Sequence, residues 1–303
     1  MIRDIARTIN DRIWIESVRK FRTRMGWVTG SKFQSYHNRA KKRHVGALET
    51  PAEIVAAAKH YQETGWAAFT LPKISSLMRS VLEKVQSSEQ NHWNSGGEYV
   101  FGDIWRLFPE IEKSFMLGVG AFVENAFKSY YKIFYGKMYQ SKNRSSSPSG
   151  SQLWHADGGP GTCMNLMLCV SNVSRRNGAM ELLSWGESLS IFEKERAWHR
   201  KISRRLSAGQ HLSKEEYRAE RAKWMEQIIL RDPNIKVHQP EGPEGMVLAF
   251  SNNLIHRGGY PEIGQERIVK IFHIYPSCMP ISYNIYHLNG IEKTASHPAC
   301  PEF

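Results

Sequence analysis

The sequence predicts a mainly β domain of the sandwich or barrel type, flanked by helices and interrupted by a helical insertion. After residue 129, short apolar segments alternate with turns rich in Gly, Pro, Asn and Ser, which is typical of such a core. Before residue 129, apolar residues recur at helical spacing. Residues 186–236 are heavily charged and also carry a helical pattern. These features predict an N-terminal extension over residues 1–49 and a domain over residues 50–303.

The N-terminal extension holds most of the charge of the chain. The 303 residues have a formal net charge of +12, and residues 1–44 carry twelve Lys and Arg against three acidic residues. Apolar residues from Ile2 to Met25 recur at helical spacing, which predicts a basic amphipathic helix. It either packs on the core with a solvated basic face or offers a surface to an acidic partner or a membrane. Asp4 and Asp11 argue against a mitochondrial transit peptide.

Composition narrows the class of protein. No run of about 18 apolar residues predicts a membrane span, and the N-terminus lacks the apolar region of a secretory signal. Four cysteines without CxxC spacing predict free thiols rather than a zinc site or a disulfide framework. We therefore expect a cytoplasmic protein. Because the charge lies outside the core, we expect no nucleic-acid partner.

The order of elements follows from local patterns. Thr50-Pro51-Ala52-Glu53 is typical of a helix start, and Gly65 of a helix end. A strand over 66–70 and a helix with an apolar stripe over 74–85 follow. The remaining strands are expected over residues 130–139, 162–170, 179–183, 246–250, 254–258 and 267–275. Within the insertion, Ser213 to Glu216 predicts a capping box. The insertion is interpreted as either a surface cover or a substrate lid.

His155, Asp157 and His256 are the candidate metal ligands. His155 and Asp157 are one residue apart, so an extended backbone places both side chains on one face. His256 lies in a short apolar strand and is the best candidate for a third ligand. Two histidines and one carboxylate on one face of an Fe(II) ion leave positions open for a 2-oxo acid and O₂. The alternative is a hydrogen-bonded core histidine beside a turn-forming aspartate.

Arg267 is the candidate anchor for the co-substrate. It follows His256 at the start of the next expected strand, so a hairpin would bring it close to the metal. A guanidinium is suited to bidentate binding of the distal carboxylate of 2-oxoglutarate. The alternative is a surface ion pair.

With these residues in view, the chain resembles the phytanoyl-CoA dioxygenase-like branch of the Fe(II)/2-oxoglutarate oxygenases over roughly residues 50–276. The resemblance rests on residues 63–66, Trp154 to Asp157, Asn172 to Met180, His256 to Gly258, and Arg267. It implies a double-stranded β-helix, or jelly roll, with helices around it. It also implies that Lys137 contacts 2-oxoglutarate, with a solvated lysine as the alternative. Gly258 departs from the family, which often has a hydroxyl residue there.

The resemblance implies an Fe(II)- and 2-oxoglutarate-dependent dioxygenase that oxidises a small organic substrate with O₂. Related halogenases replace the carboxylate ligand with a small residue, so Asp157 favours hydroxylation, desaturation or cyclisation. One alternative is the same chemistry on a substrate bound to an acidic carrier protein or CoA, docked by residues 1–44. Another is a non-enzymatic basic binding module on a degenerate jelly roll.

Overall fold

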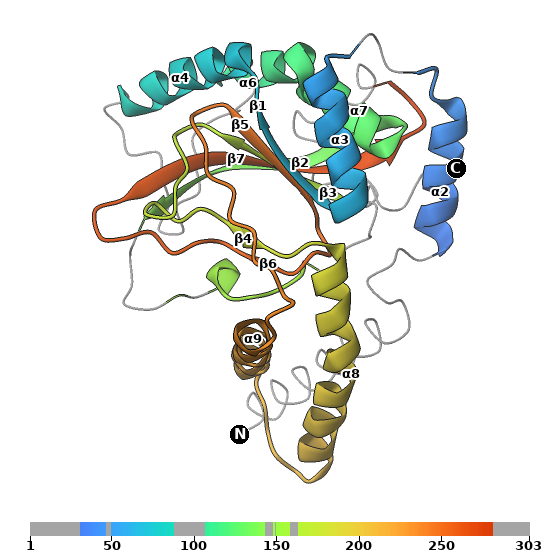
Figure 1. Ribbon diagram of the computed structural model, residues 1–303. Helices are drawn as coiled ribbons and strands as arrows, with labels where there is room; N and C mark the ends of the chain where they lie inside the picture. Colours follow the sequence, from blue (N-terminus) through green and yellow to red (C-terminus); the bar gives the residue numbers. More distant parts are fainter. Residues whose placement is uncertain are drawn as a thin grey trace, which may run out of the picture.

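Two antiparallel sheets form the centre of the protein (Figure 1). The computed structural model describes residues 31–46, 50–87, 107–142, 148, 150–157 and 163–280. The larger sheet has the strand order β1-β5-β3-β7-β2, and the smaller sheet pairs β4 with β6. The strands are β1 Trp66–Thr70, β2 Tyr130–Lys142, β3 Met164–Cys169, β4 Glu181–Leu182, β5 Met246–Ser251, β6 His256–Arg257 and β7 Glu266–Ser277.

The antiparallel core with flanking helices confirms the predicted jelly roll. The strands that the sequence predicts all form, although β4 and β6 are only two residues long. Helices nevertheless account for more of the described chain than strands do, so the fold is mixed rather than mainly β. The helices are α2 Ser31–Arg43, α3 Ala52–Thr64, α4 Pro72–Gln86, α6 Pro109–Ser114, the π-turn η1 Phe115–Val119, α7 Gly120–Phe127, η2 Gly150–Gln152, α8 Trp185–Ser207 and α9 Lys214–Arg231.

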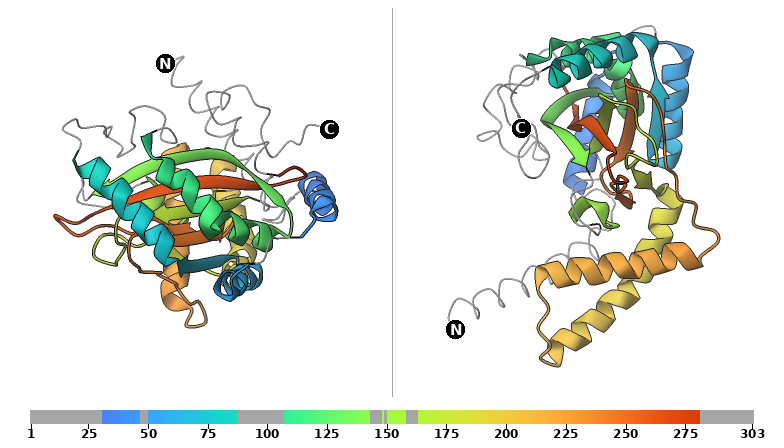
Figure 2. Two further views of the ribbon diagram at one scale, coloured as in Figure 1. Left: turned by 90° about the horizontal axis from the view of Figure 1, so that it is seen from above. Right: turned by 90° about the vertical axis from the view of Figure 1, so that its left-hand side faces the viewer.

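The helices α3, α4, α6 and α7 cover one face of the larger sheet, and the smaller sheet faces the other (Figures 1 and 2). All six residues of β3 and of β5 are buried, because helices pack on one face and the smaller sheet on the other. Leu166 and Val247 join the core beneath the helices, while Met167 and Leu248 join the core between the sheets. Burial on both faces explains why these strands are apolar except for Asn165 and Ser251.

The predicted insertion forms two long helices, α8 and α9, that leave the sheets on the side opposite α4, α6 and α7 (Figure 2). The predicted capping box is present: the Ser213 side chain accepts from the Glu216 amide, and the Glu216 carboxylate accepts from the Ser213 amide. A second capping box joins Ser184 and Glu187 at the start of α8.

The predicted helix start at Thr50 is wrong in detail. Pro51 occupies the N-cap of α3 without a side-chain cap, and Thr50 instead accepts a hydrogen bond from the Asn125 side chain at 3.3 Å. The predicted end at Gly65 is confirmed, because Gly65 has a φ of +85° and its amide donates to the Tyr61 carbonyl. Such a backbone conformation favours glycine.

The helix predicted over residues 2–25 lies outside the described residues. This basic helix and an acidic partner for it therefore stay predictions. Of the described part, α2 lies beside the sheet, where the His37 ring nitrogen contacts the Phe127 carbonyl at 2.8 Å. Among the helices described, none combines the length and the apolar character that crossing a membrane needs.

Replacing Gly65 should destabilise the fold beyond the strain of its backbone. A Cβ there would approach the Trp185 side chain to 2.7 Å, at the point where the end of α3 meets the start of α8. Gly209 has the same φ of +85°, but a Cβ added to it would meet nothing within 4 Å, so Gly209→Ala isolates the backbone cost. We expect about 1–2 kcal/mol for Gly209→Ala and a larger loss for Gly65→Ala in urea unfolding. Equal losses would show that the contact with Trp185 is unimportant.

Candidate metal centre and ligand pocket

Backbone pairing brings the two candidate histidines together. The His155 amide donates to the His256 carbonyl at 2.9 Å, and the His256 amide donates to the His155 carbonyl at 2.8 Å. This pairing is an isolated bridge, so His155 and Asp157 lie on an extended segment outside the named strands. The Asp157 amide donates to the Asn252 carbonyl at 3.0 Å, which fixes the backbone at the next candidate ligand. The side chains of His155 and Asp157 nevertheless lie on the same side of this segment.

Each histidine is oriented by its own backbone. Nδ1 of His155 lies 2.7 Å from the Leu153 carbonyl oxygen, and Nδ1 of His256 lies 2.8 Å from that of Leu254. A carbonyl only accepts, so both Nδ1 atoms donate, and in the neutral form of each ring Nε2 is the nitrogen that carries the lone pair. Nε2 of His155 lies 3.5 Å and Nε2 of His256 lies 3.9 Å from Asp157 Oδ1. The three ligand atoms lie within 4.8 Å of one another.

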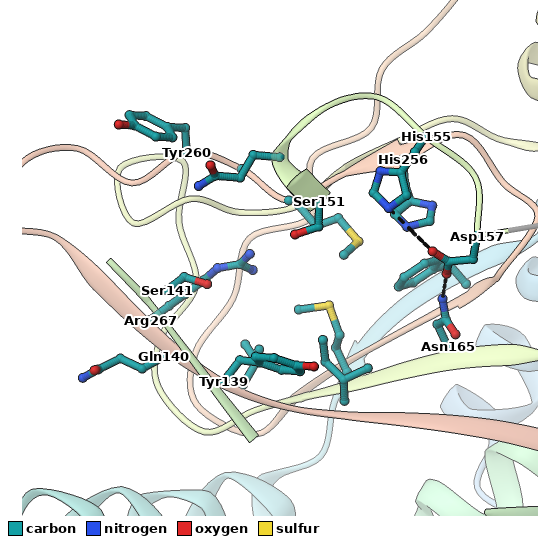
Figure 3. A pocket seen from close by; sticks show the side chains of 18 of the residues that line it. Tyr139, Gln140, Ser141, Ser151, His155, Asp157, Asn165, His256, Tyr260 and Arg267 are labelled. Carbon is teal, nitrogen blue, oxygen red and sulfur yellow. Dashed lines mark hydrogen bonds and ion pairs between the residues drawn. The ribbon is translucent and has the colours of Figure 1, made fainter. Parts of the chain in front are cut away.

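Asn165 on β3 holds the remaining oxygen of the carboxylate. Its amide Nδ2 donates to Asp157 Oδ2 at 2.6 Å, which leaves Oδ1 directed at the histidines (Figure 3). Burial raises the pKa of the Asp157 carboxyl, but His256, His155 and the hydrogen bond from Asn165 outweigh burial and hold that pKa well below its usual range. Asp157 is therefore ionised at neutral pH.

His256 is neutral at the same pH. Burial, together with the neighbouring His155, lowers the pKa of His256 to about 4. A neutral imidazole with a free Nε2 and an ionised carboxylate are the protonation states that a divalent transition metal requires of its ligands. The hydrogen bonds at Nδ1 and at Oδ2 are the outer contacts that commonly orient such ligands. The residues present thus fit a metal ion.

The three side chains line one end of a cavity of about 540 Å³ between the two sheets. Arg267 lies at the other end, with Ser141 beside it across the β2–β7 pairing (Figure 3). Apolar side chains of Met167, Met180 and Phe250 line the space between. The cavity is also lined by Tyr139, Gln140, Ser151, Tyr260, Ile271 and His273.

Arg267 is a buried cation that faces this cavity. Its residue is 4% exposed, and Nε and Nη1 have no hydrogen-bond partner among the described residues. Burial lowers the pKa of Arg267 to about 10, so the guanidinium still carries its charge at neutral pH. A buried charge without a partner is costly, which favours a site for an anionic ligand. The alternative of a surface ion pair does not fit this burial.

The expected role of Lys137 finds no support in the cavity. Lys137 lies on β2 opposite Ile271, two residues before Tyr139, but it is not among the residues that line the cavity. Its contact with 2-oxoglutarate stays a prediction that rests on the resemblance alone.

Several lining residues were not predicted. Asn165 is the one polar residue of the apolar strand Met164–Cys169, and that contrast was the available signal. Gln140 and Ser141 lie beyond the end of the strand expected over residues 130–139, whereas β2 continues to Lys142 and carries them alongside Arg267. No residue of α8 or α9 is among those that line the cavity, so its described wall does not include the insertion.

Comparison with known proteins gives a likeness to solved structures only. No family model matches the chain, and no curated protein matches its sequence significantly. The epimerase SnoN from nogalamycin biosynthesis, non-haem and α-ketoglutarate-dependent, is 14% identical; the match covers 82% of this chain and 93% of SnoN, with a TM-score of 0.47. AviO1 from Streptomyces viridochromogenes is 12% identical, with 77% and 99% covered and a TM-score of 0.46.

A third similar structure is EctD from S. alaskensis with bound Fe. It is 10% identical, the match covers 77% of this chain and 81% of EctD, and the TM-score is 0.48. Because all three TM-scores are below 0.5, the likeness adds no weight to the evidence from the site itself. Membership of the phytanoyl-CoA dioxygenase-like branch therefore stays a prediction.

Proposed function

We propose that the chain is an Fe(II)- and 2-oxoglutarate-dependent oxygenase that acts on a small organic molecule. One observation carries the proposal: a buried guanidinium, Arg267, shares a cavity with a His-Asp-His cluster at the opposite end. A metal chelated by a 2-oxo dicarboxylic acid would supply a cation to one end and an anion to the other. Few other common ligands match both ends at once.

In this proposal His155, Asp157 and His256 would hold the iron, and Arg267 would bind the distal carboxylate of 2-oxoglutarate. Asn165 would keep Asp157 turned towards the metal through the hydrogen bond to Oδ2. The apolar wall of Met167, Met180 and Phe250 would exclude water from the reacting groups. Bound iron would couple decarboxylation of 2-oxoglutarate to substrate oxidation, so that substrate, 2-oxoglutarate and O₂ yield hydroxylated product, succinate and CO₂.

Anaerobic titration of the protein with Fe(II) and 2-oxoglutarate tests the proposal. A metal-to-ligand charge-transfer absorption band should grow with both components and saturate at one equivalent of iron. Absence of the band with the unmodified chain would reject the enzyme and leave a binding module. Succinate formation, screened over candidate substrates for stimulation, then identifies the substrate class.

His155→Ala and Asp157→Ala should each abolish iron binding and turnover. Each removes one of the three residues of the cluster, which is the one group of potential metal ligands found among the described residues. Iron content after anaerobic loading and dialysis is the measurement. His273→Ala is the control, because His273 lines the same cavity but lies outside the cluster. Stoichiometric iron in either ligand variant would contradict the assignment.

Arg267→Met should weaken 2-oxoglutarate binding while sparing iron. A hydrogen bond to a charged group contributes about 1.5–3 kcal/mol, so the loss should be roughly tenfold to a hundredfold. The measurement is the 2-oxoglutarate concentration that half-saturates the charge-transfer band, with iron affinity measured separately without co-substrate. Arg267→Lys keeps the charge but not the planar fork and should lie between. An unchanged 2-oxoglutarate affinity would refute the role of Arg267.

A further inference from the structure

Helices α8 and α9 pack on the outer side of the two segments that carry the histidines. Trp154 and Ile255, the residues before His155 and His256, belong to a buried apolar cluster with Ile191 of α8 and Met225 of α9. Successive side chains of an extended segment point to opposite faces. Trp154 and Ile255 therefore face the helices, while His155 and His256 face the cavity.

Polar contacts fasten the residues on both sides of His256. The Ile255 amide donates to the Ser188 hydroxyl of α8 at 3.1 Å, and the Leu183 amide donates to the Ile255 carbonyl at 2.9 Å. On the other side, Arg257 Nη1 donates to the Glu226 carboxylate of α9 at 2.8 Å.

Arg257 also joins the two histidine segments to each other. Its Nη2 donates to Glu181 of β4 at 2.8 Å, and its guanidinium lies 4.6 Å from the ring centre of Trp154. The residue after one candidate ligand is thus stacked on the residue before the other. A shift of α9 would be transmitted through Glu226 and Arg257 to both histidine backbones.

We propose that the pair of helices α8 and α9 fixes the position of the two segments that carry His155 and His256. We call this pair of helices the brace, and Arg257 and Glu226 are its positioning residues. This inference rests on the proposed function, because it assumes that the His-Asp-His cluster binds a metal. It replaces the lid interpretation of the insertion: α8 and α9 contact the metal-bearing segments from outside, and neither helix contributes to the described lining of the cavity.

The chain offers a matched pair of substitutions. Glu226 and Glu220 both lie on α9, both side chains are 38% exposed, and both accept from an arginine. The partner of Glu226 is Arg257 beside His256, whereas the partner of Glu220 is Arg205 within the brace. Glu226→Gln and Glu220→Gln each remove one carboxylate charge with little change of shape.

Fe(II) affinity, measured anaerobically by calorimetry without co-substrate, should fall about tenfold for Glu226→Gln, the lower end of the range for partners of metal ligands. Glu220→Gln should leave it unchanged. Arg257→Met should lose at least as much, and the double variant Arg257→Met/Glu226→Gln should lose no more than Arg257→Met alone, because both act through one contact.

Linkage supplies a second readout. If the brace favours metal binding, metal binding must stabilise the brace by the same factor. Fe(II) should therefore slow hydrogen exchange of the amides around Glu226 in the unmodified chain, and this slowing should be lost in Glu226→Gln but kept in Glu220→Gln.

The outcomes separate the two proposals. No iron binding by the unmodified chain would reject the proposed function. Normal iron binding with equal affinities for Glu226→Gln and Glu220→Gln would reject the brace alone. Circular dichroism and urea unfolding check that both variants fold. Should Glu226→Gln unfold, Arg257→Met takes its place, and an unchanged iron affinity in that variant would also reject the brace.

Discussion

The mutual hydrogen bonds between the backbones of His155 and His256 are the contact on which the candidate site depends. They close the smaller layer at the point where segments distant in sequence meet, and β4 pairs with β6 on the other side of His256. Because backbone pairing sets the separation of two residues within narrow limits, the two imidazoles lie 4.3 Å apart between ring centres. Asp157 lies two residues further along the same segment, and its Oδ1 lies 3.5 Å from Nε2 of His155 and 3.9 Å from Nε2 of His256.

The larger sheet contributes the polar site residues that do not come from the two histidine segments. Asn165 on β3 and Arg267 on β7 are on different strands of this sheet, yet both point into the space between the layers. An apolar cluster that includes Met167, Leu248 and Val269 packs between the two layers. The cavity lies between the layers, from the three candidate ligands at one end to Arg267 at the other, and Met167 and Val269 of the apolar cluster line it.

The sequence was informative where chemistry depends on local spacing. The hairpin expected from His256 to Arg267 is wrong, because β6 pairs with β4 whereas β7 pairs with β2 and β3, and Arg267 lies at the far end of the cavity from the histidines. The spacing of His155 and Asp157 could be predicted, because neighbours in sequence become neighbours in space there. Asn165, Gln140 and Ser141 could not, because their positions depend on which strands pair and in what register. Thr50 is a further example. Its hydroxyl accepts a hydrogen bond from Asn125, a contact that no local sequence pattern indicates.

The distribution of buried charge is the strongest physical argument that the cavity is completed by a ligand. Asp157 and Arg267 line opposite ends of one cavity, and the two side chains form no ion pair with each other. Instead Asn165 and the histidines engage Asp157, while Nε and Nη1 of Arg267 find no described partner. Arg267 is 4% exposed whereas the Asp157 side chain is 33% exposed, so the cost in free energy falls mainly on the buried guanidinium. A ligand with a cation at one end and a carboxylate at the other would pair with Asp157 and with Arg267 and so offset this free energy. A metal-bound 2-oxo dicarboxylate has this form.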